Sequence, residues 1–118
     1  MKLQRVKAEQ MELAKDFNAT VVSRVKRDPA FARALVDEAL TLLLNGDSVT
    51  AKLILRDLVN ATIGFESLAA NLHKPSKSLH RMLSKSGNPT LENFSAVLGA
   101  IRKFLRVDVR AVVSKATA

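Results

Sequence analysis

The sequence predicts an all-α fold, and two of its features carry that prediction. Along most of the chain, apolar residues recur three and four positions apart, as the buried side of a helix requires. Residues that begin or end helices stand between these stretches: Asp28-Pro29 and Asp47-Ser48 are typical of a start, and Asn45-Gly46 of an end. With 118 residues, 47 % of them hydrophobic, the chain is long enough for one domain with its own core.

Helices are expected throughout the first half of the chain. The first ends before Asp28, the second runs from Pro29 to Asn45, and the third runs from Ser48 to Gly64. Residues 1–15 have weak periodicity and are expected to form either a mobile arm or a marginal helix. The residues expected to face inward are Phe17, Val21, Val25, Phe31, Leu35, Ala39, Leu42, Leu55, Leu58, Val59 and Thr62.

The second half predicts two short helices and a long one. The short helices are expected at 66–72 and from Pro75 onward, and the long helix begins at Thr90, after the turn-like residues 86–89. The tail alternates apolar and polar residues over 107–113 and is either a frayed extension or a short strand, which would need a partner strand. The inward residues are expected to be Leu68, Ala69, Leu72, Leu79, Met82, Leu83, Leu91, Phe94, Leu98, Ile101 and Leu105.

The charge of the chain favours a polyanionic partner. It has 19 Lys and Arg against 11 Asp and Glu, a net charge of +8. Most of the excess lies in residues 64–118, which contain 9 basic and 3 acidic side chains. The stretch 73–88 has four Lys or Arg and no acid. Such a cluster indicates nucleic acid first and an anionic membrane surface second, and the alternative is a merely solvated face.

The sequence lacks the residues that several classes of function require. Without cysteine there is no disulfide, thiolate metal site or cysteine nucleophile, and His73 and His80 alone are expected to be polar surface rather than metal ligands. No glycine-rich phosphate loop or nucleophile elbow is present, so we expect no enzyme activity and no cofactor. No apolar run approaches a membrane span, and the charged residues 1–10 lack a signal core, so a cytoplasmic protein is expected.

The most informative stretch is FESLAANLHKPSKSLHRML, residues 65–83. It predicts two short helices joined by a turn around His73-Lys74-Pro75. The small Ala69 allows their backbones to approach, and the second helix buries Leu79 and Leu83. The other side of that helix stays free to enter the major groove of DNA.

In these residues the sequence resembles the helix-turn-helix of Cro and phage-repressor-type regulators, and most closely the addiction-module antidote (antitoxin) branch. Members of that branch read roughly L-A-x-x-x-G, then S-L-x-R-x-L, then G-N-P. The corresponding residues here are Leu68-Ala69, SLHRML at 78–83 and GNP at 87–89. The DPAF at 28–31 and the LRD at 55–57 also resemble the N-terminal extension of that family, and the motif likeness covers about residues 50–105.

The resemblance implies which side chains contact DNA. Ser76, Lys77 and Arg81 are expected to reach base edges, with Lys77 or Arg81 suited to guanine. Secondary candidates for DNA contact are Ser78 and His80, and the candidates for phosphate contact are Lys74, Ser84, Lys85 and Asn88.

The sequence departs from the family at both ends of the first short helix. His73 stands in the turn where the family often has glycine, and a non-glycine residue with positive φ costs about 1 kcal/mol. Phe65 stands where related repressors often have a glutamine that binds phosphate, so one contact to the DNA backbone is absent.

The sequence therefore predicts a repressor-like helix-turn-helix domain of about five helices at 47–106, preceded by an N-terminal helical extension at 1–46 and followed by the tail at 107–118. The expected function is sequence-specific binding of double-stranded DNA and repression of transcription, with a homodimer as the binding form. The resemblance implies that the protein represses the operon that encodes it. It also implies that a cognate toxin is a second partner. The alternative is a protein-interaction module that uses the helix-turn-helix only as a scaffold.

Overall fold

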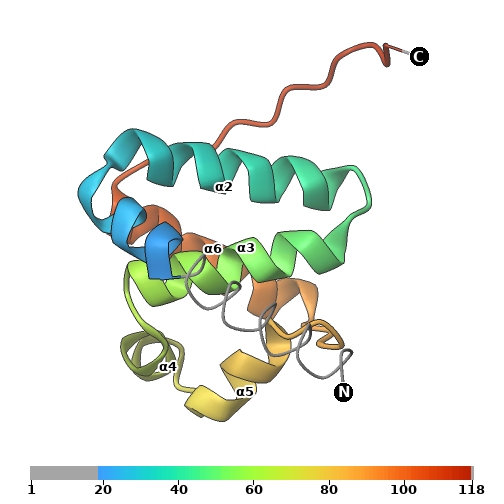
Figure 1. Ribbon diagram of the computed structural model, residues 1–118. Coiled ribbons are helices and arrows are strands. Elements are labelled where there is room, and N and C mark those ends of the chain that lie inside the picture. The colour runs from blue at the N-terminus through green and yellow to red at the C-terminus, as the bar shows by residue number, and fades with distance from the viewer. Residues whose placement is uncertain (1–18, 118) are drawn as a thin grey trace, which may run out of the picture.

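A computed structural model describes residues 19–117, which are helical apart from turns and an extended tail (Figure 1). The arm or marginal helix expected at 1–15, and the inward position expected for Phe17, lie outside the described residues. Helical residues 19–27 are followed by α2 (Pro29–Leu44), α3 (Ser48–Ala61), α4 (Phe65–Leu72), α5 (Ser76–Met82) and α6 (Leu91–Leu105). The all-α prediction is confirmed over this range.

In the folded molecule, α5 and the tail lie at opposite ends. α2 and α3 pack side by side, and α6 lies behind α3 in the view of Figure 1. The short helices α4 and α5 form the lower end in that view, and residues 107–117 leave from the upper end past α2. The surface of α5 is therefore remote from the tail.

Side-chain caps fix where three of the helices begin. The carboxylate of Asp28 accepts a hydrogen bond from the backbone N–H of Phe31 at 3.2 Å. The carboxylate of Asp47 does the same for Thr50 at 3.1 Å, and the hydroxyl of Thr90 for Asn93 at 3.1 Å. Hydrogen bonds from the Thr50 backbone and side chain also lower the pKa of Asp47. These caps occur at the predicted starts.

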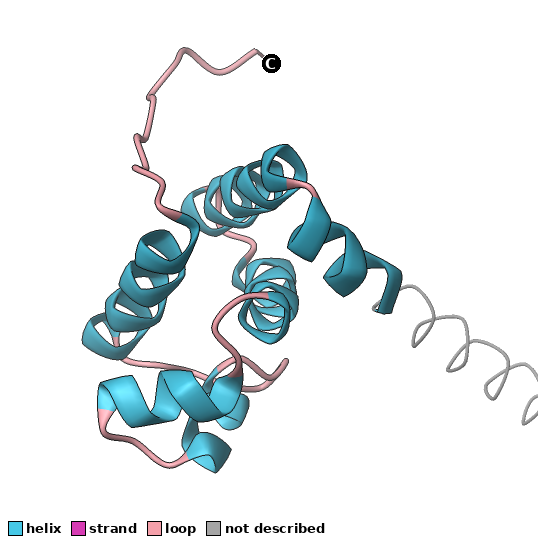
Figure 2. Cartoon of the chain, turned by 90° about the vertical axis from the view of Figure 1, so that its left-hand side faces the viewer, coloured by secondary structure: helices cyan, strands magenta, loops and turns pink. Residues whose placement is uncertain are grey.

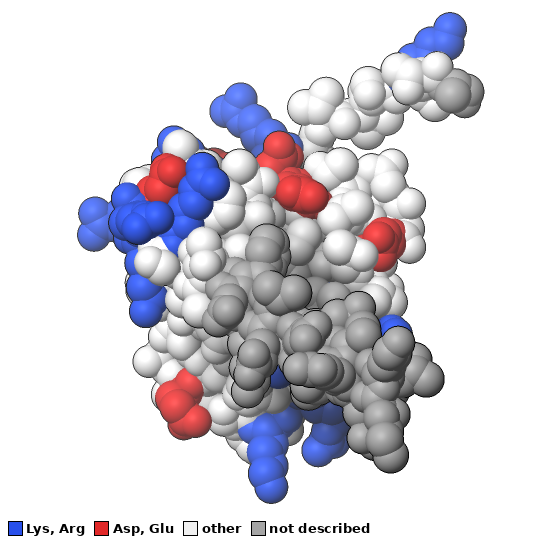
Figure 3. Space-filling view, in the orientation of Figure 1, with Lys and Arg blue, Asp and Glu red and all other residues white. Residues whose placement is uncertain are grey.

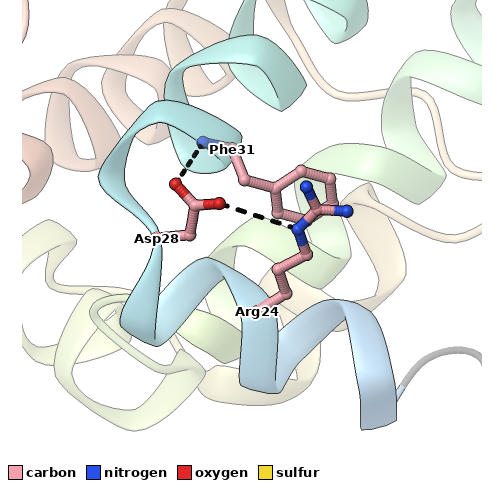
Figure 4. Close-up of polar contacts among 3 residues, drawn as sticks. All are labelled: Arg24, Asp28 and Phe31. Carbon is pink, nitrogen blue, oxygen red and sulfur yellow. Dashed lines mark hydrogen bonds and ion pairs between the residues drawn. The ribbon is translucent and has the colours of Figure 1, made fainter.

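Three side chains connect residues 19–27 to α2 (Figure 4). Besides capping α2, Asp28 lies with its Oδ2 3.7 Å from Nε of Arg24. The guanidinium of Arg24 lies over the ring of Phe31, 4.1 Å from its centroid. Both interactions are partly exposed, so each contributes about 1 kcal/mol or less. Together they join residues 19–27 to the first turn of α2.

One core runs through all the helices. Val25, Ala32, Val36 and Ala39 belong to the same buried cluster as the side chains of α3 to α6. The predicted boundary between an extension at 1–46 and a domain at 47–106 is therefore not a break in the core. The largest fully buried side chains are Leu55, Leu58, Val59, Leu68, Leu79, Leu83, Val97 and Ile101.

One expectation from the sequence is wrong, and one of the two alternatives left open for the tail is not found. Leu91, expected to face inward, is 86 % exposed because it is the first residue of α6 and projects beyond the end of the core. The strand considered for 107–113 is absent, and no strand occurs within residues 19–117. Val112 and Val113 are almost fully exposed, and the tail has no neighbouring strand to supply backbone hydrogen bonds.

The helices within residues 19–117 are too short, or too polar, for any of them to cross a membrane.

Candidate nucleic-acid interface

The turn between α4 and α5 is set by a left-handed residue. His73 has φ 54° and ψ 44°, a conformation that glycine adopts most easily. The N–H of Lys74 donates to the carbonyl of Ala69 at 3.0 Å, and the N–H of His73 to that of Ala70 at 3.4 Å. This pair of hydrogen bonds is the Schellman arrangement that ends many helices. Histidine therefore occupies the backbone position that the family resemblance assigns to glycine.

The second short helix has an inner and an outer face. Leu79 and Leu83 are fully buried, and Ala69 on α4 is buried as well. Lys77, His80 and Arg81 are exposed on the opposite face of α5, one helical turn or less apart. Of the predicted base-contacting residues, Lys77 and Arg81 are thus free to meet a partner, whereas Ser76 is half-buried at the start of the helix, and so is the secondary candidate Ser78.

A ring stack joins α5 to α4. The imidazole of His80 lies over the ring of Phe65, with the ring centroids 3.8 Å apart and the planes 18° from parallel. Phe65 is buried, so it provides a fixed platform for His80. Sequence reasoning missed this contact, because the two residues are on different helices and no spacing rule relates them. The stack restricts the position of His80, which was a secondary candidate for DNA contact.

The loop after α5 is held by a buried lysine. Lys52 of α3 is 6 % exposed, and its Nζ donates to the carbonyls of Lys85 and Gly87, the first at 3.2 Å. Gly87 itself passes so close to α5 that a Cβ there would lie 2.1 Å from the carbonyl oxygen of Arg81. A sequence signal for Lys52 existed, since it lies three and seven residues before the buried Leu55 and Val59.

The predicted phosphate-contacting residues lie around the ends of α5. Lys85 and Asn88 are exposed in the loop that follows the helix, and Lys74 is half-buried in the turn that precedes it. The hydroxyl of Ser84 donates to the carbonyl of Arg81 at 2.7 Å. Because its proton is used within the chain, Ser84 offers a phosphate oxygen no donor in this conformation.

The surroundings of α5 are positively charged. No Asp or Glu occurs between Glu66 and Glu92, and this stretch contains Lys74, Lys77, Arg81 and Lys85. Figure 3 shows Lys and Arg side chains projecting from the lower end of the molecule, where α5 lies in Figure 1. Among residues 19–117 no group of three or more His, Cys, Asp or Glu side chains could hold a metal ion.

Asp57, which lies away from α5, has a pKa above the ordinary value for Asp. Asp57 of α3 is half-buried and has no hydrogen-bond or ion-pair partner among residues 19–117. Burial raises its pKa, and the neighbouring Arg56 opposes that shift. It borders a shallow pocket of about 360 Å³ together with Val22 and Asn60.

Comparison of the chain with models of known protein families, with curated proteins and with solved structures finds no match. The resemblance to repressor-type regulators thus depends on the motifs at 28–31, 55–57 and 65–89.

Proposed function

We propose that this chain is a transcriptional regulator that binds double-stranded DNA in a sequence-specific manner, with α4 and α5 as its helix-turn-helix. The observation that carries the proposal is the division of α5 into two faces. Leu79 and Leu83 fix the helix on the core, while Lys77 and Arg81 project outward from a stretch of sequence, 67–91, that contains no acidic residue. This arrangement is what a helix needs in order to enter the major groove.

The side chains on α5 suit the reading of bases. Arg81 can donate two hydrogen bonds to O6 and N7 of guanine, and Lys77 can reach the same acceptors from one turn earlier. Ser76, at the first position of the helix, is the third residue that we assign to base contact. Each good bidentate contact discriminates between bases by about 1–3 kcal/mol.

The side chains around α5 suit the sugar–phosphate backbone. Lys85 and Asn88 are exposed beyond the end of the helix, and Lys74 precedes its start. Contacts from these residues would fix the position of α5 on the duplex without reading its sequence. We leave Ser84 out of this set because its hydroxyl donates to the carbonyl of Arg81.

The regulatory part of the proposal comes from the motif resemblance. By that resemblance the chain represses its own operon and also neutralises a cognate toxin, often a small ribonuclease in that branch. A unit of this size makes few base contacts, so we propose that a homodimer reads two half-sites about one DNA turn (~34 Å) apart. A gene for a small toxin beside the gene for this chain would support the antitoxin role.

The proposal is tested by titrating the upstream promoter duplex, and an unrelated duplex of equal length, with the chain and its variants. We expect Lys77→Ala with Arg81→Ala to abolish the preference for the promoter while the circular dichroism spectrum is unchanged. The matched control is Lys26→Ala with Arg27→Ala, which removes the same charge from exposed positions outside the helix-turn-helix. It should retain the preference.

Salt dependence separates DNA binding from the protein-interaction alternative. The affinity for DNA should fall by roughly 0.9 log units per log unit of salt for each phosphate neutralised. A helix-packing interface with a protein would change little over the same range. If the parent chain and the Lys77/Arg81 double variant bind the promoter duplex with equal affinity and equal preference, the proposed reading face is contradicted.

A further inference from the structure

A groove of about 760 Å³ runs between α6 and the end of α4. Ile63 and Leu72 line one side of it, and Ala96, Gly99, Ala100 and Phe104 of α6 line the other. Phe104 is 53 % exposed, which is unusual for so large an apolar side chain. In Figure 2, α6 is the helix that leads into the tail, and it lies at the edge of the chain with no other element on its outer side.

On its groove side, α6 has the residue spacing that lets two helices pair, and the four residues with this spacing are called the seam below. Glu92, Ala96, Gly99 and Lys103 follow one another at steps of four, three and four, which places them in one line along the helix. The two residues in the middle of the seam, Ala96 and Gly99, have small side chains, and the space where a Cβ of Gly99 would lie is open. A second helix can therefore approach this side of α6 closely.

The two ends of the seam carry opposite charges. Glu92 and Lys103 are both exposed, and neither has an ion-pair partner among residues 19–117. If another α6 lies antiparallel along the seam, Glu92 of each copy meets Lys103 of the other, so the ion pair forms twice. A parallel arrangement would instead bring like charges together, which is destabilising. The seam is therefore complementary to itself in the antiparallel direction only.

We propose that this groove is the interface of a two-fold homodimer, in which α6 of a second copy packs antiparallel against α6. An isologous interface of this kind uses the same patch on both copies, and the seam meets that condition. In this register Phe104 of each copy lies beside the first turn of α6 of the other and is removed from water. The proposal deepens the proposed function, which needs two reading helices, but its test requires no DNA.

The test is charge reversal at the two ends of the seam, with self-association measured by sedimentation at increasing protein concentration. Glu92→Lys and Lys103→Glu each place two like-charged pairs in the interface, and each should weaken the dimer by about tenfold or more. Mixing the two variants should restore association as a heterodimer, because every contact then joins opposite charges. Native mass spectrometry distinguishes the heterodimer from both homodimers.

Matched controls place the same charge changes elsewhere on the surface. Glu38→Lys on α2 and Lys115→Glu in the tail are exposed in the structure and should leave the dimer unchanged. Phe104→Ala should weaken it without altering the circular dichroism spectrum. A parent chain that stays monomeric, a dimer indifferent to both reversals, or variants that do not recover on mixing would each overturn the proposal.

Discussion

The substitution Lys52→Met tests whether the buried lysine holds the loop that follows α5. Methionine keeps the length and most of the packing of the side chain but removes the ammonium group. The structure gives that group two hydrogen bonds, to the carbonyls of Lys85 and Gly87, and no carboxylate partner among residues 19–117. Hydrogen bonds made by a charged group contribute about 1.5–3 kcal/mol to stability.

The free energy of unfolding should therefore fall by about 1.5–3 kcal/mol in Lys52→Met, since the two carbonyls lose their donor. For a domain of this size the corresponding fall in Tm is on the order of 10 °C. Urea unfolding followed by circular dichroism gives the free energy, and a thermal scan gives Tm.

The matched control is Lys85→Met, which removes an exposed ammonium group from the same loop but leaves the carbonyl that Lys52 binds. Exposed substitutions of this kind usually change stability by about 0.5 kcal/mol or less. Equal unfolding free energies for the two variants would refute the role assigned to Lys52.

Substitutions at three further positions test the backbone and electrostatic features of the fold. Gly87→Ala should lower stability by about 1–3 kcal/mol in urea unfolding, because its Cβ would lie 2.1 Å from the carbonyl oxygen of Arg81; an unchanged midpoint would argue against that close approach. His73→Gly should raise stability by up to about 1 kcal/mol by relieving the left-handed conformation, whereas His73→Val should lower it, and the opposite order would contradict the turn geometry. Asp57→Asn should raise Tm at pH 7 but not at pH 3, about one unit below the ordinary Asp pKa. The raised pKa of Asp57 means that the folded state retains a proton which the unfolded state releases, so stability falls as pH rises through that window; a pH-independent Tm difference would exclude this cause.

Local signals were sufficient to predict where the helices lie. The starts of α2, α3 and α6 were predicted from Asp28, Asp47 and Thr90, whose side chains each accept a hydrogen bond from the backbone three residues later. A cap depends only on neighbouring residues, so it can be read without knowing the tertiary structure. The inward positions of Leu79 and Leu83 likewise follow from helical periodicity.

Contacts between distant segments were not predictable from the sequence. Lys52 binds a loop more than thirty residues away, and His80 stacks on Phe65 of another helix. Neither contact has a spacing rule, because each depends on how the helices cross. The exposure of Leu91 depends on where the core ends, which periodicity alone does not give.

The most direct test of base reading by α5 is the loss of discrimination at a single base pair. A preferred duplex is first selected from a random library with the parent chain, and Arg81→Ala is then titrated with that duplex and with each of its single-base variants. Our account predicts that discrimination is lost at one position per half-site, by about 1–3 kcal/mol, and is retained elsewhere. A uniform loss of affinity across all variants, or no loss at all, would contradict it.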